Sequence, residues 1–133
     1  MSPAPSAPAA TADAAPMSVE EALGHALRLH RAGHLEPAEK IYRAILGLCP
    51  DEAEALHLLG MLRHARGDSA EAIVLIRRAL ARVPDAPGAW NNLGNVLLES
   101  GSVEEAIAAY RRCLEFVPDF AEAHNNLGTI HRS

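Results

Sequence analysis

Residues 90–118 read WNNLGNVLLESGSVEEAIAAYRRCLEFVP, and the small residues and proline of this stretch recur along the chain. The prolines stand 34 residues apart, at Pro50, Pro84 and Pro118. Two glycine series and one alanine series keep the same spacing, at Gly33, Gly67 and Gly101, at Gly60, Gly94 and Gly128, and at Ala38, Ala72 and Ala106. A fixed period of this size is typical of stacked helical hairpins, so the sequence predicts a repeat array rather than a domain with one closed core.

Composition excludes several classes of protein. Of the 133 residues, 49% are hydrophobic and only 4% aromatic, so the interior is expected to consist mainly of alanine and aliphatic side chains. The formal charge of -5 gives no electrostatic reason to expect nucleic acid or an anionic membrane as a partner. No run approaches the ~20 apolar residues of a membrane span, and the N-terminus lacks the pattern of a secretory signal. We therefore expect a cytoplasmic protein.

The two cysteines, Cys49 and Cys113, lie nearly two repeats apart. Along a stack of hairpins their Cα atoms would exceed the ~7 Å limit for a disulfide. We expect two reduced thiols, and Cys113 stands at a position that favours a small core residue.

Residues 1–17, MSPAPSAPAATADAAPM, form a Pro/Ala-rich leader in which no core can form, and we predict that it is disordered. Order is expected from Ser18, which makes the S-x-x-E capping pattern with Glu21. Helical periodicity then predicts seven helices, at about 18–32, 35–48, 52–66, 69–82, 86–100, 103–116 and 120–132.

Cap and packing positions follow the same period. Gly33, Gly67 and Gly101 suit the left-handed position after the first helix of a hairpin. Aspartates after the three prolines suit the N-cap of the next helix, at Asp51, Asp85 and Asp119. Two further capping pairs are predicted, Asp68 with Glu71 and Ser102 with Glu105. Small residues are predicted where helix backbones approach closely, at Gly60, Ala72 and Ala79 and at Gly94, Ala106 and Cys113.

The pattern Trp90-x-x-Leu93-Gly94, followed by Gly101, Ala106, Tyr110 and Pro118, resembles the tetratricopeptide repeat. The resemblance covers residues 19–133, with less regular copies before the quoted one and a fourth copy that has only its first helix. It implies an all-α, right-handed solenoid of antiparallel helix pairs. The predicted domain is 18–133, with repeats 19–52, 53–86 and 87–120 and a partial repeat 121–133.

In this family the first helices line a concave groove that binds proteins, often as extended peptides. Carried onto this chain, the groove includes His57, Met61, His64, Asn91, Asn92, Asn95, Asn125 and Asn126. An amide side chain both donates and accepts, so a column of asparagines can pair with the C=O and N–H groups of a peptide. The asparagine pairs are similar to the ladder with which O-GlcNAc transferases hold protein substrates. Their alternative role is that of ordinary polar groups on a solvated groove.

Other sites are disfavoured. Family members that bind chaperone tails clamp a carboxylate with basic groove residues, whereas this groove carries Glu20, Glu54 and Glu122. The histidines lack a Cys or carboxylate at a metal-site spacing, so we expect structural or solvated histidines, no metal site and no cofactor. Arginines at the same 34-residue spacing, Arg43, Arg77 and Arg111, are expected on the solvated convex face. With no catalytic constellation in the sequence, we expect no enzyme activity.

The main prediction is therefore a protein–protein interaction scaffold that binds an extended peptide in its concave groove. Two alternatives remain open. The chain could be the N-terminal, substrate-recruiting arm of a longer glycosyltransferase or sulfotransferase, which is an argument from fold analogy. Alternatively, Leu127 and Ile130, for which the sequence supplies no second helix, could face another subunit in a self-associating structural module.

Overall fold

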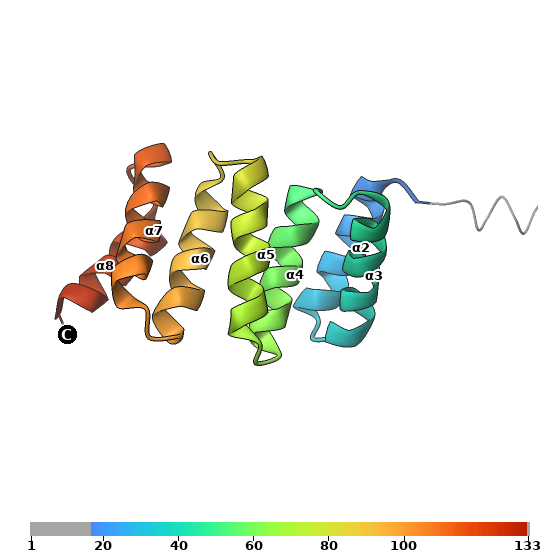
Figure 1. Cartoon of the computed structure of the whole chain (residues 1–133), viewed down its shortest axis with the longest axis horizontal. Helices are drawn as coiled ribbons and strands as arrows, with labels where there is room; N and C mark the ends of the chain where they lie inside the picture. Colours follow the sequence, from blue (N-terminus) through green and yellow to red (C-terminus); the bar gives the residue numbers. More distant parts are fainter. Residues whose placement is uncertain (1–16, 133) are drawn as a thin grey trace, which may run out of the picture.

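The computed structural model describes residues 17–132, and these residues form seven α-helices joined by short turns. The helices are α2 (Val19–Arg31), α3 (Leu35–Leu48), α4 (Ala53–Ala65), α5 (Ser69–Arg82), α6 (Pro87–Glu99), α7 (Val103–Phe116) and α8 (Ala121–Arg132). They follow one another along the long axis of the molecule, from the hairpin of the blue α2 and the green α3 at one end to the red α8 at the other (Figure 1). The predicted all-α solenoid is confirmed, with helix ends within a residue of those expected. Of the predicted leader, only Met17 lies within the described residues.

The turn inside each hairpin depends on glycine. Gly33, Gly67 and Gly101 have φ angles of 89°, 94° and 88°, a region in which side chains with a Cβ are strained. Each glycine ends the first helix and lets the chain reverse into the second, as the sequence predicted.

The helix caps confirm only some of the capping residues predicted from the sequence. Ser18 and Glu21 form the predicted reciprocal box, with N–O distances of 3.0 and 2.9 Å. The carboxylate of Asp68 accepts from the backbone N–H of Glu71 at 3.0 Å, which also confirms the prediction. Ser102 is the N-cap of α7, but its side chain makes no capping hydrogen bond.

The aspartates that follow the prolines are not N-caps, so this prediction was wrong for Asp51, Asp85 and Asp119. Pro50 occupies the second position of a turn that the Glu52 N–H closes on the Cys49 carbonyl at 3.0 Å. This turn uses one more residue than expected. The cap of α4 is consequently Glu52, whose carboxylate accepts from the N–H of Ala55.

All three proline carbonyls in these turns accept a side-chain hydrogen bond, at Pro50, Pro84 and Pro118. Trp90 Nε1 donates to the Pro84 carbonyl at 2.8 Å. His124 stands at the equivalent position one repeat later, and its Nε2 binds the Pro118 carbonyl at 2.7 Å. Leu56 holds that position in the preceding repeat and has no donor. Arg78 Nη2 replaces it at 3.1 Å, so each hairpin is tied to the turn by a different side chain.

Close packing explains the second glycine series. A Cβ placed on Gly94 would lie 2.6 Å from Cε1 of Tyr110, and one on Gly60 would lie 2.8 Å from Cγ1 of Ile76. Tyr110 and Ile76 are both fully buried, so the helix pairs α6–α7 and α4–α5 approach as closely as the predicted small residues allow.

Ion pairs tie the second helices together on the outer face. Arg43 of α3 binds Glu71 of α5 at 3.3 Å, and Arg77 of α5 binds Glu105 of α7 at 3.1 Å, one repeat later. These arginines are exposed, as expected, but each bridges two repeats rather than only facing solvent.

A denser ionic cluster surrounds Arg63 on α4. Its guanidinium binds Glu71 at 2.8 Å and both Glu39 and Asp68 at 3.3 Å. The three carboxylates come from α3, from the turn before α5 and from α5 itself. This one side chain therefore connects the first two hairpins.

Candidate functional site

The first helix of each hairpin lies on the inner side of the array. Among helices that are not consecutive in the chain, the closest approaches join α2 to α4 and α4 to α6. The second helices show no comparable approach, so the stack curves towards its first helices. Every predicted groove residue lies on a first helix: His57, Met61 and His64 on α4, Asn91, Asn92 and Asn95 on α6, and Asn125 and Asn126 on α8.

Asn91 differs from the other predicted groove residues because it is buried, with 1% of its surface exposed. Its Nδ2 donates to Oε1 of Glu122 at 2.7 Å, and its Oδ1 accepts from Nδ2 of Asn126 at 3.4 Å. Asn125 occupies the equivalent place one repeat later and is exposed. The sequence placed Asn91 on an open groove, but the structure uses it to hold α6 against α8.

Asn95 joins three elements. Its Oδ1 accepts from the Tyr110 hydroxyl at 2.7 Å and from Nδ2 of Asn126 at 3.0 Å. Burial, with the charges of Glu122 and Glu99, raises the pKa of Tyr110 to about 12, so its hydroxyl remains a donor. These contacts use both acceptor positions of the Asn95 oxygen and leave its amide N–H groups for a ligand.

Asn92 bridges α6 and α4. Its Nδ2 lies 2.8 Å from Nε2 of His57, which is 35 residues earlier in the chain. Burial lowers the pKa of His57, so the ring is neutral at pH 7 and Nε2 can accept the hydrogen bond. Asn92 retains one N–H and its oxygen for other partners.

His64 makes a second bridge, at the other end of α4. Its Nδ1 lies 2.9 Å from the Ser69 hydroxyl, and its Nε2 lies 2.8 Å from Oε1 of Glu99 on α6. Met61, one turn before, is half-buried and packs against the core. The inner face of α4 therefore combines an apolar thioether with two histidines whose rings are held in position.

Carboxylates give this surface a negative character. Glu54, Glu99 and Glu122 are all exposed on first helices. Partial burial, reinforced by the neighbouring charge of Glu52, raises the pKa of Glu54. A cationic group near this part of α4 would relieve that repulsion.

The described residues provide neither a metal site nor a membrane span. Within residues 17–132, no group of three or more His, Cys, Asp or Glu residues is placed to hold a metal ion. No helix in this part of the chain has the length and apolar character needed to cross a membrane. Both cysteines are free thiols, as predicted, and burial raises the pKa of Cys113.

Comparison with known families identifies the repeat. A tetratricopeptide-repeat profile matches residues 23–87 and 65–119, which together cover more than half of the chain. The chain belongs to the tetratricopeptide-repeat family. Members of such repeat families present extended concave surfaces to other proteins. No curated protein matches the sequence significantly.

Solved structures of other tetratricopeptide-repeat proteins share the fold. A Thermobaculum terrenum O-GlcNAc transferase variant is 39% identical over 82% of this chain and 21% of its own, with a TM-score of 0.79. The chain therefore spans about a fifth of that transferase. The protein MamA is 26% identical over 90% of this chain and 70% of its own, with a TM-score of 0.81.

A third structure is that of the first tetratricopeptide-repeat domain of Spaghetti (RPAP3), bound to the HSP90 peptide SRMEEVD. It is 20% identical over 86% of this chain and 90% of its own, with a TM-score of 0.81. At this identity the comparison shows a common fold alone.

The tetratricopeptide-repeat register also explains which site residues the sequence analysis missed. Tyr110 and Ser69 were not predicted to contact the groove, yet they hold Asn95 and His64. The two helices of a hairpin are antiparallel, so residues at similar distances from the glycine turn lie opposite each other. For Asn95, six residues before Gly101, this pairing gives only the neighbourhood of Tyr110, nine residues after it, and the long tyrosine side chain completes the contact.

Proposed function

We propose that the inner surface of this array binds an extended segment of a partner protein through the side-chain amides of Asn92, Asn95 and Asn126. These residues lie on the first helices of successive repeats and are half-buried. A row of amides suits peptide backbone, because each can meet an N–H or a C=O group whatever the peptide side chain.

The observation that carries this proposal is the mutual bonding of the amides. Asn92 is held by His57, while Asn95 and Asn126 hold each other at 3.0 Å. The donors and acceptors that remain are complementary, because Asn95 offers N–H groups and Asn126 offers its oxygen. Since the amides are already oriented, less entropy is lost when a peptide binds.

The residues around the three amides determine which peptides we expect this surface to prefer. Asn125 adds an exposed amide on α8, and Met61 supplies apolar contact on α4. The glutamates of this surface disfavour an acidic peptide end, so we do not propose binding of a chaperone tail. The RPAP3 domain and the Yersinia enterocolitica chaperone SycD, solved with a peptide of YopD, support the proposal only as examples of this fold holding peptides.

A selection from a random peptide display library, followed by calorimetry on an enriched peptide, tests the proposal. Asn92→Ala combined with Asn126→Ala should weaken binding about tenfold or more, since two hydrogen bonds are lost. N-methylation of the peptide backbone should have a similar effect. The matched control Arg111→Ala lies on the outer helix α7 and should not change affinity. Unchanged binding by the double variant, with its helicity intact, would refute the proposal.

A second candidate function is presentation of protein substrates to a transferase domain. The 39% identity to part of an O-GlcNAc transferase favours it, and the surface proposed above would then hold the substrate. Sequencing the complete reading frame tests this candidate. A transferase domain on the same polypeptide supports it, and a complete frame without one contradicts it.

A further inference from the structure

A small pocket lies beside the row of asparagine amides, between the N-terminal parts of α4 and α6 and the C-terminal end of α5. It has a volume of about 240 Å³, with Ala79, Ala86 and Ala89 among its walls and Glu52, Glu54 and His57 as its polar groups. Nε2 of His57 lies 2.8 Å from Nδ2 of Asn92, so the pocket adjoins the surface that we propose holds peptide backbone. Its volume is below the range of ~300–1,000 Å³ typical of sites for whole ligands, and it suits a single side chain.

Two alanines leave this pocket open. The residue equivalent to Ala86 one repeat later is Phe120, and the residue equivalent to Ala79 one repeat earlier is Ile45. Phe120 packs against the core, and Ile45 is buried. Where α4, α5 and α6 meet, each of these two positions has only a methyl group, so the space that a larger side chain fills in a neighbouring repeat is free for a ligand.

The two carboxylates of the pocket have no cation beside them. Glu52 uses one oxygen to cap α4, where it accepts from the N–H of Ala55 at 2.9 Å, and Glu54 is exposed. Within residues 17–132, neither carboxylate forms an ion pair. The lining includes no lysine or arginine, and α6 carries no basic residue. Burial and the charge of Glu52 raise the pKa of Glu54, as expected for a carboxylate without a cationic partner.

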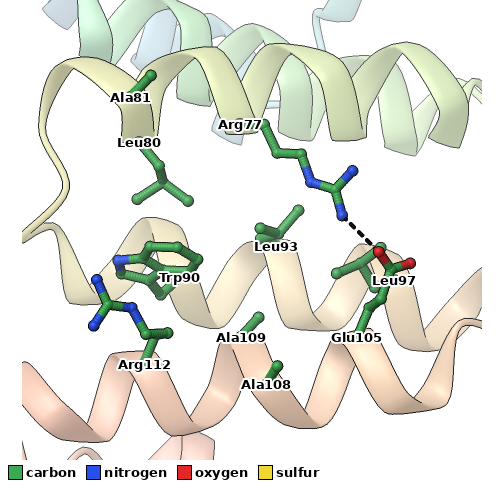
Figure 2. Close-up of a pocket in the computed structure, with 10 residues that line it drawn as sticks. All are labelled: Arg77, Leu80, Ala81, Trp90, Leu93, Leu97, Glu105, Ala108, Ala109 and Arg112. Atoms are coloured by element: carbon green, nitrogen blue, oxygen red, sulfur yellow. Dashed lines mark hydrogen bonds and ion pairs between the residues drawn. The ribbon is translucent and has the colours of Figure 1, made fainter.

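A larger furrow on the outer face, between α5 and α7, differs in this respect. Its Arg77 is paired with Glu105 at 3.1 Å (Figure 2), and its Arg112 is paired with Glu115. The arginines of the outer furrow are therefore already neutralised, whereas the carboxylates of the inner pocket are not.

We propose that this pocket receives a lysine or arginine side chain of the bound segment, and that Glu54 determines the preference for it. The inference rests on the proposed function, because the amides of the neighbouring surface hold the backbone from which that side chain projects. The aliphatic stem of a lysine or arginine lies along apolar walls while its charged group stays at the surface. Here the stem would contact the alanines and Val83, and the charged group would meet Glu54 at the mouth. An acidic side chain would meet like charge.

Three peptide probes test the inference. They are acetylated, amidated heptapeptides of alanine and serine that differ only in the central residue, which is lysine, norleucine or glutamate. Norleucine keeps the aliphatic stem of lysine without its charge. Calorimetry should show that the lysine peptide binds about fivefold more tightly than the norleucine peptide and that the glutamate peptide binds most weakly. The backbone N–H signals of Ala86 and Ala89 should shift saturably below about 1 mM lysine peptide. Equal binding of the lysine and norleucine peptides, or no saturable shift of these signals, would overturn the inference.

Variants make the test specific to the pocket. Glu54→Gln should abolish the preference for lysine over norleucine. The matched control is Glu104→Gln, which changes an exposed glutamate in the first turn of the outer helix α7 and should keep the preference. Ala86→Phe introduces the side chain of the next repeat, closes the pocket and should weaken binding of the lysine peptide about fivefold. If this variant does not fold, Glu54→Lys gives a second test, because it should make the glutamate peptide the tightest binder. A lysine preference that survives in Glu54→Gln would overturn the inference.

The outcomes separate this inference from the proposed function. Asn126→Ala, on α8 and outside the pocket, should weaken binding of all three peptides alike and leave their ratio unchanged. Weakened binding without any lysine preference in the parent chain would contradict the pocket and leave the amide surface supported. A lysine preference that depends on Glu54, together with no effect of Asn126→Ala, would contradict the amide surface and leave the pocket supported.

Discussion

The Asn91 side chain donates to Oε1 of Glu122 at 2.7 Å and links α6 to the first helix of the next repeat. Asn91 is 1% exposed, while Asn125, its equivalent one repeat later, is exposed. At this repeat position the asparagine of α6 is thus an internal tie between two repeats, and the asparagine of α8 stands on the last helix of the described residues.

This difference predicts unequal effects of one substitution. Asn91→Asp replaces a buried donor by a carboxylate that faces Glu122, and should destabilise the fold at pH 7 by about 2 kcal/mol or more. Asn125→Asp should change stability by less than about 0.5 kcal/mol. Urea unfolding of both variants measures the difference. Equal losses would show that Asn91 is not buried against Glu122.

A second prediction concerns the approach of α6 to α7. Gly94→Ala places a methyl group against the ring of Tyr110 and should cost about 1–3 kcal/mol, despite the higher helix propensity of alanine. Gly47→Ala is the matched control, because a Cβ at that helical position meets no atom within 4 Å. The control should gain up to about 1 kcal/mol. Thermal or urea unfolding measures both changes in stability. If both variants gained stability, the packing argument would be contradicted.

A third prediction concerns pH. Burial holds the pKa of His57 below its ordinary value of 6.5, so the unfolded chain binds more protons as pH falls through 6.5. Stability should therefore fall on acidification below that value. His57→Gln should reduce this dependence, and a smaller slope should remain because burial and Arg31 also lower the pKa of His30.

The measurement is urea unfolding of the parent chain and the variant from about pH 7.5 to pH 5.5. NMR titration of the His57 ring in the folded protein is an independent check. Parallel stability profiles for the two proteins would exclude His57 as a source of the pH dependence.

A fourth prediction concerns the ionic cluster around Arg63. Arg63→Ala leaves Glu39, Asp68 and Glu71 close together without their shared cation, and should lower the urea midpoint clearly. Arg77→Ala removes one exposed pair with Glu105 and should lower it less. The gap between the two variants should shrink at high salt, because screening weakens repulsion among the remaining carboxylates. If the difference between the two urea midpoints did not change with salt, the loss would come from packing rather than from charge.

Much of the fold could be predicted because its signals are local. The glycine turns, the capping box at Ser18 and the small residues at Gly60 and Gly94 follow from backbone geometry within one hairpin. The N-caps after the prolines were predicted wrongly because the turn around Pro50 takes one residue more than the motif suggests. The donors to the proline carbonyls were not foreseen, because a different side chain serves in each repeat.

The sequence by itself therefore determined the repeat family, the number and ends of the helices within residues 17–132 and which small residues let them pack. Its 34-residue period repeats local geometry, and that geometry depends on neighbours a few residues away. Only the tertiary structure decided that Asn91 is buried against Glu122 of α8, and that Arg112 lies over the Trp90 ring. Those outcomes depend on what the adjacent repeat places opposite each residue, and equivalent positions within the period meet different neighbours.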